Sequence, residues 1–202
     1  HREPISTDLP THTIALDAYY IAHTEVTQAL WRAVMTDWEF VEEFYMPNSP
    51  MSYVNWYDCQ EFVRRLDSIT GLPFRLPTEA EWEFAARGGN KSLGYRFAGS
   101  NSPELVSWGL SNAGFRRHEV GRKLPNELGL YDMTGNVSEW CADWYGPYYI
   151  GTEPNPQGAQ DGKNKVYRGS SFDNCKENSY ISHRYSTDPL ESNSYCGLRL
   201  AL

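Results

Sequence analysis

Residues 129–145 read GLYDMTGNVSEWCADWY, and this stretch decides the fold. Its apolar side chains belong to Leu130, Tyr131, Met133, Val137, Trp140, Cys141, Trp144 and Tyr145. They follow neither helical nor strand spacing, and two glycines lie among them. Because apolar surface is costly to expose, we expect this loop to be buried at the centre of the fold. Its backbone then needs hydrogen-bond partners, which polar side chains of the stretch or a cation would supply.

The composition indicates many loops around an aromatic core. The chain has 202 residues, which is enough to bury a sizeable core in a single domain. Hydrophobic residues make up 40% and aromatic residues 14%, with 16 glycines and 12 prolines beside them. This mixture excludes a simple helical bundle and favours irregular structure. We therefore expect one domain over residues 1–202.

The charge of the chain excludes two classes of partner. The net charge is -8 and the pI about 5.1, so neither nucleic acid nor an anionic membrane surface is expected to bind. Basic side chains gather in one cluster, and a solvated loop accounts for it: Arg116, Arg117, Arg122 and Lys123. In the same region, Trp108 and Phe115 are expected to anchor the loop.

No stretch of the sequence is apolar enough to cross a bilayer, and the chain begins at His1 without a signal-like segment. A membrane attachment is therefore expected only through an N-terminal anchor that the sequence does not include. The cysteines, which have neither CxxC nor zinc-ligand spacing, are Cys59, Cys141, Cys175 and Cys196. Cys59 lies on an apolar helical stripe, so we expect a buried hydrophobe rather than a reactive thiol.

Capping residues predict three helices, and β-forming residues predict four strands. Thr27 precedes a helix at 28–35, Asn55 precedes one at 56–68 that Gly71 ends, and Thr78 opens one that runs to Arg87. The strands are expected at residues 13–21, 166–172, 178–185 and 197–200. Acidic side chains in the third helix are expected to complement its dipole and cap it, rather than form a site: Glu79, Glu81 and Glu83.

The predicted elements carry three recognisable motifs. They read EVTQALWRAVM at residues 25–35, GLPFRLPTEAEWEFAARGG at 71–89 and GLYDMTGNVSEW at 129–140. These motifs resemble segments of the formylglycine-generating enzymes, also called sulfatase-modifying factors, and the likeness runs from about Tyr19 to Leu202. The resemblance implies an α+β, C-type lectin-like fold, with short helices around small twisted antiparallel sheets and much irregular loop. Such a fold does not by itself imply a function.

The resemblance also implies a metal site beneath the central motif. In family members with calcium there, the ligands are backbone carbonyls and one glutamate. This pattern maps onto Thr134, Gly135 and Val137 and onto the side chain of Glu139. Oxygen ligands from a loop suit Ca²⁺. The alternative is that Glu139 accepts hydrogen bonds from loop N–H groups, and the sequence leaves both open.

The cysteines weaken the oxidase function that the resemblance implies. The enzymes of this family use two closely spaced cysteines that bind copper, and soft thiolates suit Cu(I). Cys175 falls near the first of these positions, but no second cysteine lies nearby. We therefore expect no copper and no catalytic residues. A formylglycine-generating oxidase, or an inactive relative of one, stays as the alternative function.

The C-terminal segment, residues 168–199, has the composition of a binding surface. Serine, tyrosine, asparagine and aspartate predominate in it, and apolar core residues are nearly missing. Tyrosine offers a rigid amphipathic contact area, and serine and asparagine offer adaptable hydrogen bonds. We expect the segment to lie on the surface. The candidate ligand contacts are Phe172, Asp173, Asn174, Cys175, Asn178, Tyr180, Ser182, His183, Tyr185, Ser186, Thr187, Asp188, Ser192, Ser194 and Tyr195.

This combination resembles the variable proteins of diversity-generating retroelements, treponemal ones in particular. In these, adenines in asparagine codons of a template are randomised, and a randomised codon never encodes Lys, Glu, Gln, Trp or Met. Between Ser170 and Cys196 only Lys176, Glu177 and Glu191 break that rule. The resemblance implies a receptor or adhesin-like protein, extracytoplasmic or at the cell surface. Its ligand is expected to be a protein, bound through the C-terminal segment.

Overall fold

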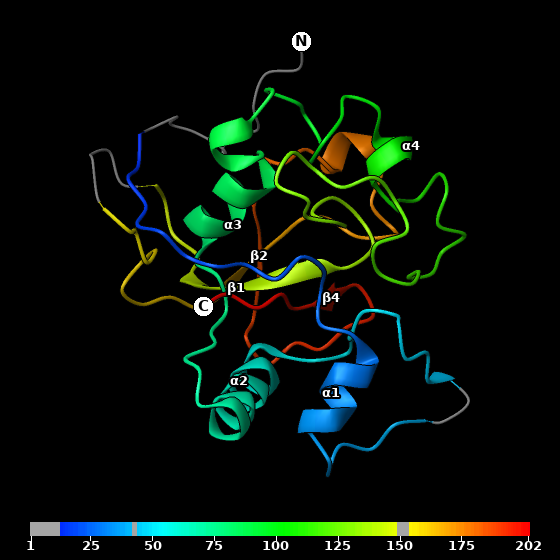
Figure 1. Ribbon diagram of the computed structural model, residues 1–202, viewed down its shortest axis with the longest axis vertical. Coiled ribbons are helices and arrows are strands. Elements are labelled where there is room, and N and C mark those ends of the chain that lie inside the picture. Colours follow the sequence, from blue (N-terminus) through cyan, green and yellow to red (C-terminus); the bar gives the residue numbers. More distant parts are fainter. Residues whose placement is uncertain (1–12, 42–43, 149–153) are drawn as a thin grey trace.

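The computed structural model describes residues 13–41, 44–148 and 154–202. Within these residues the architecture is α+β, with four α-helices, one four-stranded sheet and long irregular connections. Figure 1 shows the strand β1 in the middle of the molecule, with α1 and α2 on one side of it and α3 on the other. No helix in the described part of the chain is both long and apolar enough to cross a membrane.

The three capped helices lie where the sequence predicts them. They are α1 (Gln28–Val34), α2 (Trp56–Thr70) and α3 (Glu79–Ala86), and the structure adds α4 (Pro103–Val106). Thr27, Asn55 and Thr78 each accept a hydrogen bond from a backbone N–H of the first turn. Gly71 ends α2 in the left-handed conformation, with φ 71°. Two 3-10 helices are η3 (Gly89–Lys91) and η4 (Lys176–Asn178).

The sheet is small and mixed. Its strands are β1 (Ser138–Trp144), β2 (Lys165–Arg168), β3 (Tyr185–Thr187) and β4 (Cys196–Gly197), in the spatial order β3-β2-β1-β4. β2 pairs with β1 and with β3 in antiparallel fashion, whereas β4 runs parallel to β1. The expectation of purely antiparallel pairing is wrong for this one pair. Both edge strands, β3 and β4, come from the C-terminal segment.

The predicted strands are wrong in extent or place. Residues 13–21 make isolated bridges at Ala15 and Ile21 and no named strand. Between 178 and 185 the chain leaves η4 and turns, and β3 begins only at Tyr185. β2 ends earlier than predicted, because Gly169 and Ser170 have φ of 96° and 59° and leave the extended conformation.

β1 separates two apolar clusters that make up the core. One contains Trp31 of α1, Phe62 of α2 and Trp140 of β1, and the other contains Trp82 of α3 and Cys141 of β1. Neighbouring strand residues point to opposite faces, so β1 supplies side chains to both clusters. A strand covered on both faces shows no apolar and polar alternation in its sequence. The predicted burial of the central stretch is confirmed, but its second half is a strand rather than a loop.

Candidate ligand-binding surface

The end of the C-terminal segment is fixed by a buried ion pair. Arg199 Nη2 lies 2.7 Å from Glu139 Oε1, and Arg199 Nε lies 2.9 Å from Glu139 Oε2. Trp82 Nε1 donates to the same Oε2 at 2.6 Å. The pair is inaccessible to solvent, with side-chain exposures of 0% and 1%. A guanidinium that meets a carboxylate with two parallel hydrogen bonds fixes both position and orientation.

This ion pair engages the carboxylate that the calcium prediction requires. A divalent cation beside Glu139 would also face the positive charge of Arg199. Within the described residues, no group of three or more His, Cys, Asp or Glu side chains is placed to hold a metal. The predicted ligand set contains one such side chain, Glu139, and the backbone carbonyls of Thr134, Gly135 and Val137, so calcium there stays a prediction, which the engagement of Glu139 by Arg199 disfavours. Glu139 accepts hydrogen bonds from the side chains of Trp82 and Arg199, and not from the loop N–H groups of the alternative prediction.

Two more carboxyl groups lie near this pair, and both keep their protons more tightly than usual. Burial raises the pKa of Glu25 well above its ordinary value, and the charge of Asp132 raises it further. Burial also raises the pKa of Asp132. Glu25 Oε1 accepts from Asn136 Nδ2 at 3.0 Å, and Asp132 Oδ2 accepts from Gly121 N at 2.6 Å. Burial is the largest cause of both raised pKa values, so both carboxyl groups favour the protonated form.

The start of the C-terminal segment is fixed by a second buried arginine. Arg168 donates to Glu79 at 2.7 Å, to Glu83 at 2.5 Å and to the carbonyl of Ile181 at 2.8 Å. Arg184 donates to both carboxylate oxygens of Glu79 at 2.6 Å. These ion pairs tie the segment to α3 at two points. The sequence analysis missed them, since the arginines lie far along the chain from the glutamates.

Asn136 joins the C-terminal segment to the loop at residues 107–121. Its backbone carbonyl accepts from Phe172 N, and its side-chain Oδ1 accepts from His118 N, both at 2.9 Å. Asn136 has φ 61°, in the left-handed region that asparagine tolerates better than most residues. A second bond between the two segments runs from Leu110 N to the carbonyl of Asn174, at 3.0 Å. The loop and the start of the C-terminal segment therefore lie side by side.

Aromatic side chains form a continuous row on β2, β3 and the turns beside them. The ring centroids of Tyr180 and His183 are 5.6 Å apart, and those of His183 and Tyr185 are 6.3 Å apart. Tyr185 stacks on Tyr167 at 5.3 Å, and Tyr195 lies 6.3 Å from Tyr167. We call these five residues the aromatic row. Such rings combine a large apolar area with polar tips, which suits them to recognition.

The sequence analysis missed Tyr167, although a signal for it was present. Val166 and Arg168 are fully buried, so the residue between them faces the other side of β2. Tyr167 is the cross-strand partner of Tyr185, a residue that was predicted. Once β2 is aligned with β3, the stack of the two tyrosines follows from the register.

The structure divides the predicted contact residues by exposure. The exposed ones are Asp173, Asn178, Asp188 and Ser192. The half-buried ones are Asn174, Cys175, Tyr180, Ser182, Tyr185, Ser186, Thr187, Ser194 and Tyr195. Phe172 and His183 are buried, as is Ile181 between them, so the expectation that the whole segment lies on the surface is wrong. The segment supplies both core and surface residues.

Three of the four cysteines lie in the core. Cys59, Cys141 and Cys196 are buried, and burial raises the pKa of each thiol well above its ordinary value. Cys196 belongs to the same apolar cluster as Cys59. Cys175 is half-buried at the N-terminus of η4. Burial thus favours the protonated thiol in the three core cysteines, and Cys175 is the partly accessible one.

A cavity of about 500 Å³ is lined by none of the predicted contact residues. Its walls include Trp56, Gln60, Arg75 and Lys165. The charged groups there are satisfied by their own neighbours: Arg75 pairs with Glu81 at 2.6 Å, and Lys165 Nζ donates to the carbonyl of Ala142 at 2.7 Å. Arg75 and Lys165 are thus engaged by protein groups, and the C-terminal segment stays the candidate site.

Comparison with known proteins identifies the class to which this C-type lectin-like fold belongs. A model of the sulfatase-modifying factor enzyme 1-like domain matches residues 2–202, so the chain belongs to this family. Among solved structures it is similar to Treponema denticola variable protein 1. The two are 31% identical, with a TM-score of 0.88, and the match covers 100% of this chain and 89% of that one.

Curated relatives include proteins with other names. The chain is 34% identical to the chaperone protein LppX of Paenibacillus barcinonensis, over 65% of this chain and 64% of that protein. It is also 34% identical to the formylglycine-generating enzyme of Thermomonospora curvata, over 77% of this chain and 56% of the enzyme. The chain thus spans less than two thirds of the length of these relatives.

Proposed function

We propose that this protein binds a protein ligand through its C-terminal face, which we define as Tyr167 and residues 171–195. One observation carries the proposal: a surface rich in tyrosine and small polar residues is held between two fully buried arginines, Arg168 and Arg199. The anchors belong to the frame, and the residues between them supply the contacts. Side chains on the face can therefore change while the frame persists.

A rigid frame also favours tight binding. Association costs free energy for every flexible side chain or loop that becomes ordered. On the C-terminal face, folding already orders many of these side chains. The aromatic row is stacked, and Arg184 ties the turn before β3 to α3. Tyrosine loses little side-chain entropy on binding, and it is the residue that paratopes use most.

The further part of the proposal is that the face is diversified, as in the variable proteins of diversity-generating retroelements. The similarity to Treponema denticola variable protein 1 over the whole chain supports it. A diversified receptor needs access to its ligands, so we propose an extracytoplasmic or cell-surface location.

The DNA beside the gene tests diversification directly. We expect a near-copy of the region that encodes residues 168–199, next to a reverse-transcriptase gene. Asparagine codons in that copy should fall at exposed and half-buried positions such as Asp173, Tyr180 and Tyr185, and not at Arg168 or Arg199. A flanking region without such a copy would overturn diversification, and binding would then be tested by itself.

The second candidate function is a formylglycine-generating oxidase. The family and the 34% identity to the Thermomonospora curvata enzyme favour it, and Cys175 is accessible enough to react. The buried position of Cys196 weighs against it. Titration of the reduced protein with Cu(I) separates the two functions. Stoichiometric binding that both Cys175→Ser and Cys196→Ser abolish would favour the oxidase, whereas no stoichiometric binding supports the ligand-binding function.

A further inference from the structure

We infer that Phe115, Arg116 and Arg117, here called the basic tip, form a constant part of the binding face and select protein ligands with an acidic surface. The inference rests on the proposed function and names the class of partner. The basic tip lies outside residues 168–199, so diversification of that segment would leave it unchanged. It would give every version of the protein one shared contact.

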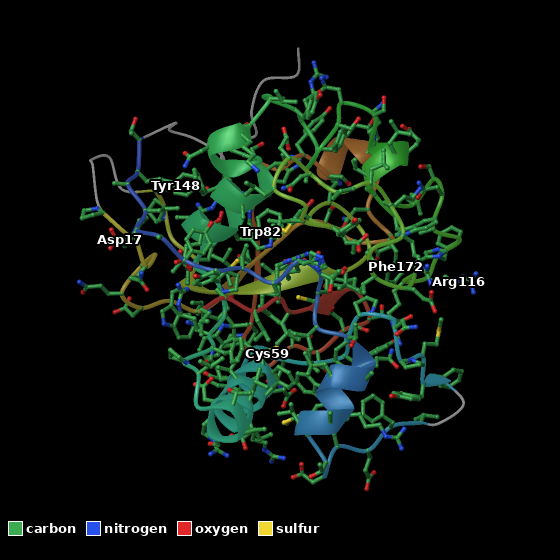
Figure 2. All side chains as sticks on the ribbon, viewed as in Figure 1. Asp17, Cys59, Trp82, Arg116, Tyr148 and Phe172 are labelled. Carbon is green, nitrogen blue, oxygen red and sulfur yellow. The ribbon has the colours of Figure 1, made fainter. Side chains whose placement is uncertain are left out.

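Backbone contacts place the loop that carries the basic tip against the C-terminal face. Leu110 N bonds to the carbonyl of Asn174, and a Cβ added at Gly109 would lie only 3.3 Å from that oxygen. Directly after the basic tip in the chain, His118 N donates to the side chain of Asn136, and Phe172 N donates to the backbone carbonyl of the same residue. Figure 2 shows Arg116 and Phe172 on the same side of the molecule. A ligand on the C-terminal face therefore comes within reach of the basic tip.

Phe115 presents its ring to solvent at a conformational cost. It was expected to anchor the loop, yet it is 76% exposed. Its φ is 60°, in the left-handed region that bulky residues rarely adopt. Neither burial nor backbone preference explains a phenylalanine at this position. An aromatic side chain held in contact range of a partner does explain it, because aromatic residues are enriched in interface cores.

Within the described residues, the two arginines of the basic tip make no ion pair with a carboxylate, whereas eight other arginines do. These eight are Arg64, Arg65, Arg75, Arg87, Arg122, Arg168, Arg184 and Arg199. Neither Arg116 nor Arg117 has a carboxylate within 4.0 Å among those residues. Arg117 is half-buried, and its Nε is buried without a hydrogen-bond acceptor.

Charge favours an acidic polypeptide as that partner. The chain carries a net charge of -8, so an acidic ligand is repelled by most of the surface and attracted at the basic tip. This contrast would orient the ligand toward the basic tip. A nucleic acid is disfavoured, because two arginines neutralise few phosphates and the net negative charge of the chain repels them. Phe115 adds an apolar contact that a phosphate backbone would not use.

The test selects peptides from a phage-displayed random library on the intact protein. We expect the selected peptides to be enriched in Asp and Glu. Arg116→Gln combined with Arg117→Gln should weaken their binding roughly tenfold, mainly through a slower association rate, and should reduce the dependence on salt. The matched control is Arg87→Gln combined with Arg122→Gln. It removes the same charge from arginines that already pair with Glu83 and Glu119, and binding should change less than twofold.

A second variant separates binding from stability. Phe115→Asn replaces a bulky residue with one that tolerates the left-handed conformation, so the melting temperature should rise by a few degrees while peptide affinity falls. A structural role for the ring would instead lower the melting temperature and overturn the inference.

The outcomes also distinguish this inference from the proposed function. One outcome is that the selected peptides bind more weakly to Tyr180→Ala and Tyr185→Ala but equally well to both double arginine variants. This result would overturn the inference about the basic tip and leave the proposed function standing. Unchanged affinity for the tyrosine variants as well, or a library that returns no binders, would overturn both the inference and the proposed function.

Discussion

Glu139 and Arg199 are 60 residues apart in the sequence, yet their side chains form a solvent-inaccessible pair. Glu139→Gln would leave the guanidinium buried without its counter-charge, and such a loss costs roughly 3–5 kcal/mol. We expect a decrease of this size in the free energy of unfolding, measured by urea denaturation at pH 7. Arg64→Gln removes a partner from an exposed pair and should have little effect. Equal effects of the two substitutions would show that the buried pair does not hold the C-terminal segment.

Glu25 predicts a dependence of stability on pH. Burial raises its folded pKa well above the ordinary value of a glutamate, so the folded protein takes up a proton. The stabilisation from this proton is complete below the unfolded pKa and is lost as the pH rises through the folded pKa. Glu25→Gln resembles the protonated form at every pH. Urea midpoints should therefore favour the variant more at pH 8 than at pH 5, and an equal difference at both values would contradict the raised pKa.

The sequence identified Glu139 as a key residue but not its partner. A glutamate in a buried, apolar stretch must be neutralised, and both a cation and loop N–H groups were reasonable sources. The choice depends on which side chain reaches it, and Arg199 arrives there only because β4 pairs with β1. That pairing is a long-range property which local spacing does not contain. The same reason explains why the partners of Glu79 and Glu83 were missed.

The start of α3 carries a second pH-dependent contact. Asp143 Oδ2 accepts from Glu79 N at 2.7 Å, and burial, followed by the charge of Glu79, raises the pKa of Asp143 to about 7. Stability from this group should fall as the pH rises from about 4 to 7. Asp143→Asn keeps an acceptor for the N–H of Glu79 and removes the titration. The urea midpoint of the variant should therefore vary less over this range than that of the wild type. A wild-type midpoint that rises over the same range, with no change of slope in the variant, would contradict it.

Helices were predictable as elements, and strands were not. The helix starts depend on Thr27, Asn55 and Thr78, whose side chains act within three residues of themselves. The strands depend on partners elsewhere: β1 is buried on both faces and β4 contains only two residues. Neither shows the alternation by which a strand is recognised. The edge strand β3 begins later than predicted for the same reason.

At the scale of the whole molecule, the motifs gave the fold class and the composition gave the candidate site. Exposure within the site was harder to predict, because a short segment between two anchors must alternate between core and surface. Ile181 packs in the cluster of Trp82, while Asp173 and Asn178 remain exposed. Polar composition therefore marked the segment, and the sheet and the anchors decided which side chains face outward.

This division predicts where the whole molecule tolerates change. Asp173, Asn178, Asp188 and Ser192 are exposed, and surface substitutions usually shift stability by less than about 0.5 kcal/mol each. Replacing all four with alanine should therefore leave the melting temperature within a few degrees of the wild type. The control in the same segment is Ile181→Ala, which creates a cavity in the core and should cost about 2–5 kcal/mol.

The stabilities of the fourfold variant and of Ile181→Ala have to be compared, because diversification requires a face that tolerates substitution on a core that does not. If the fourfold variant loses as much stability as Ile181→Ala, the face would be part of the core, and no randomised version of it would fold. If both variants are as stable as the wild type, Arg168 and Arg199 would hold the frame without help from the residues between them. The expected pattern, tolerance at the four exposed positions and loss at Ile181, is the one that lets a constant frame carry a changing surface.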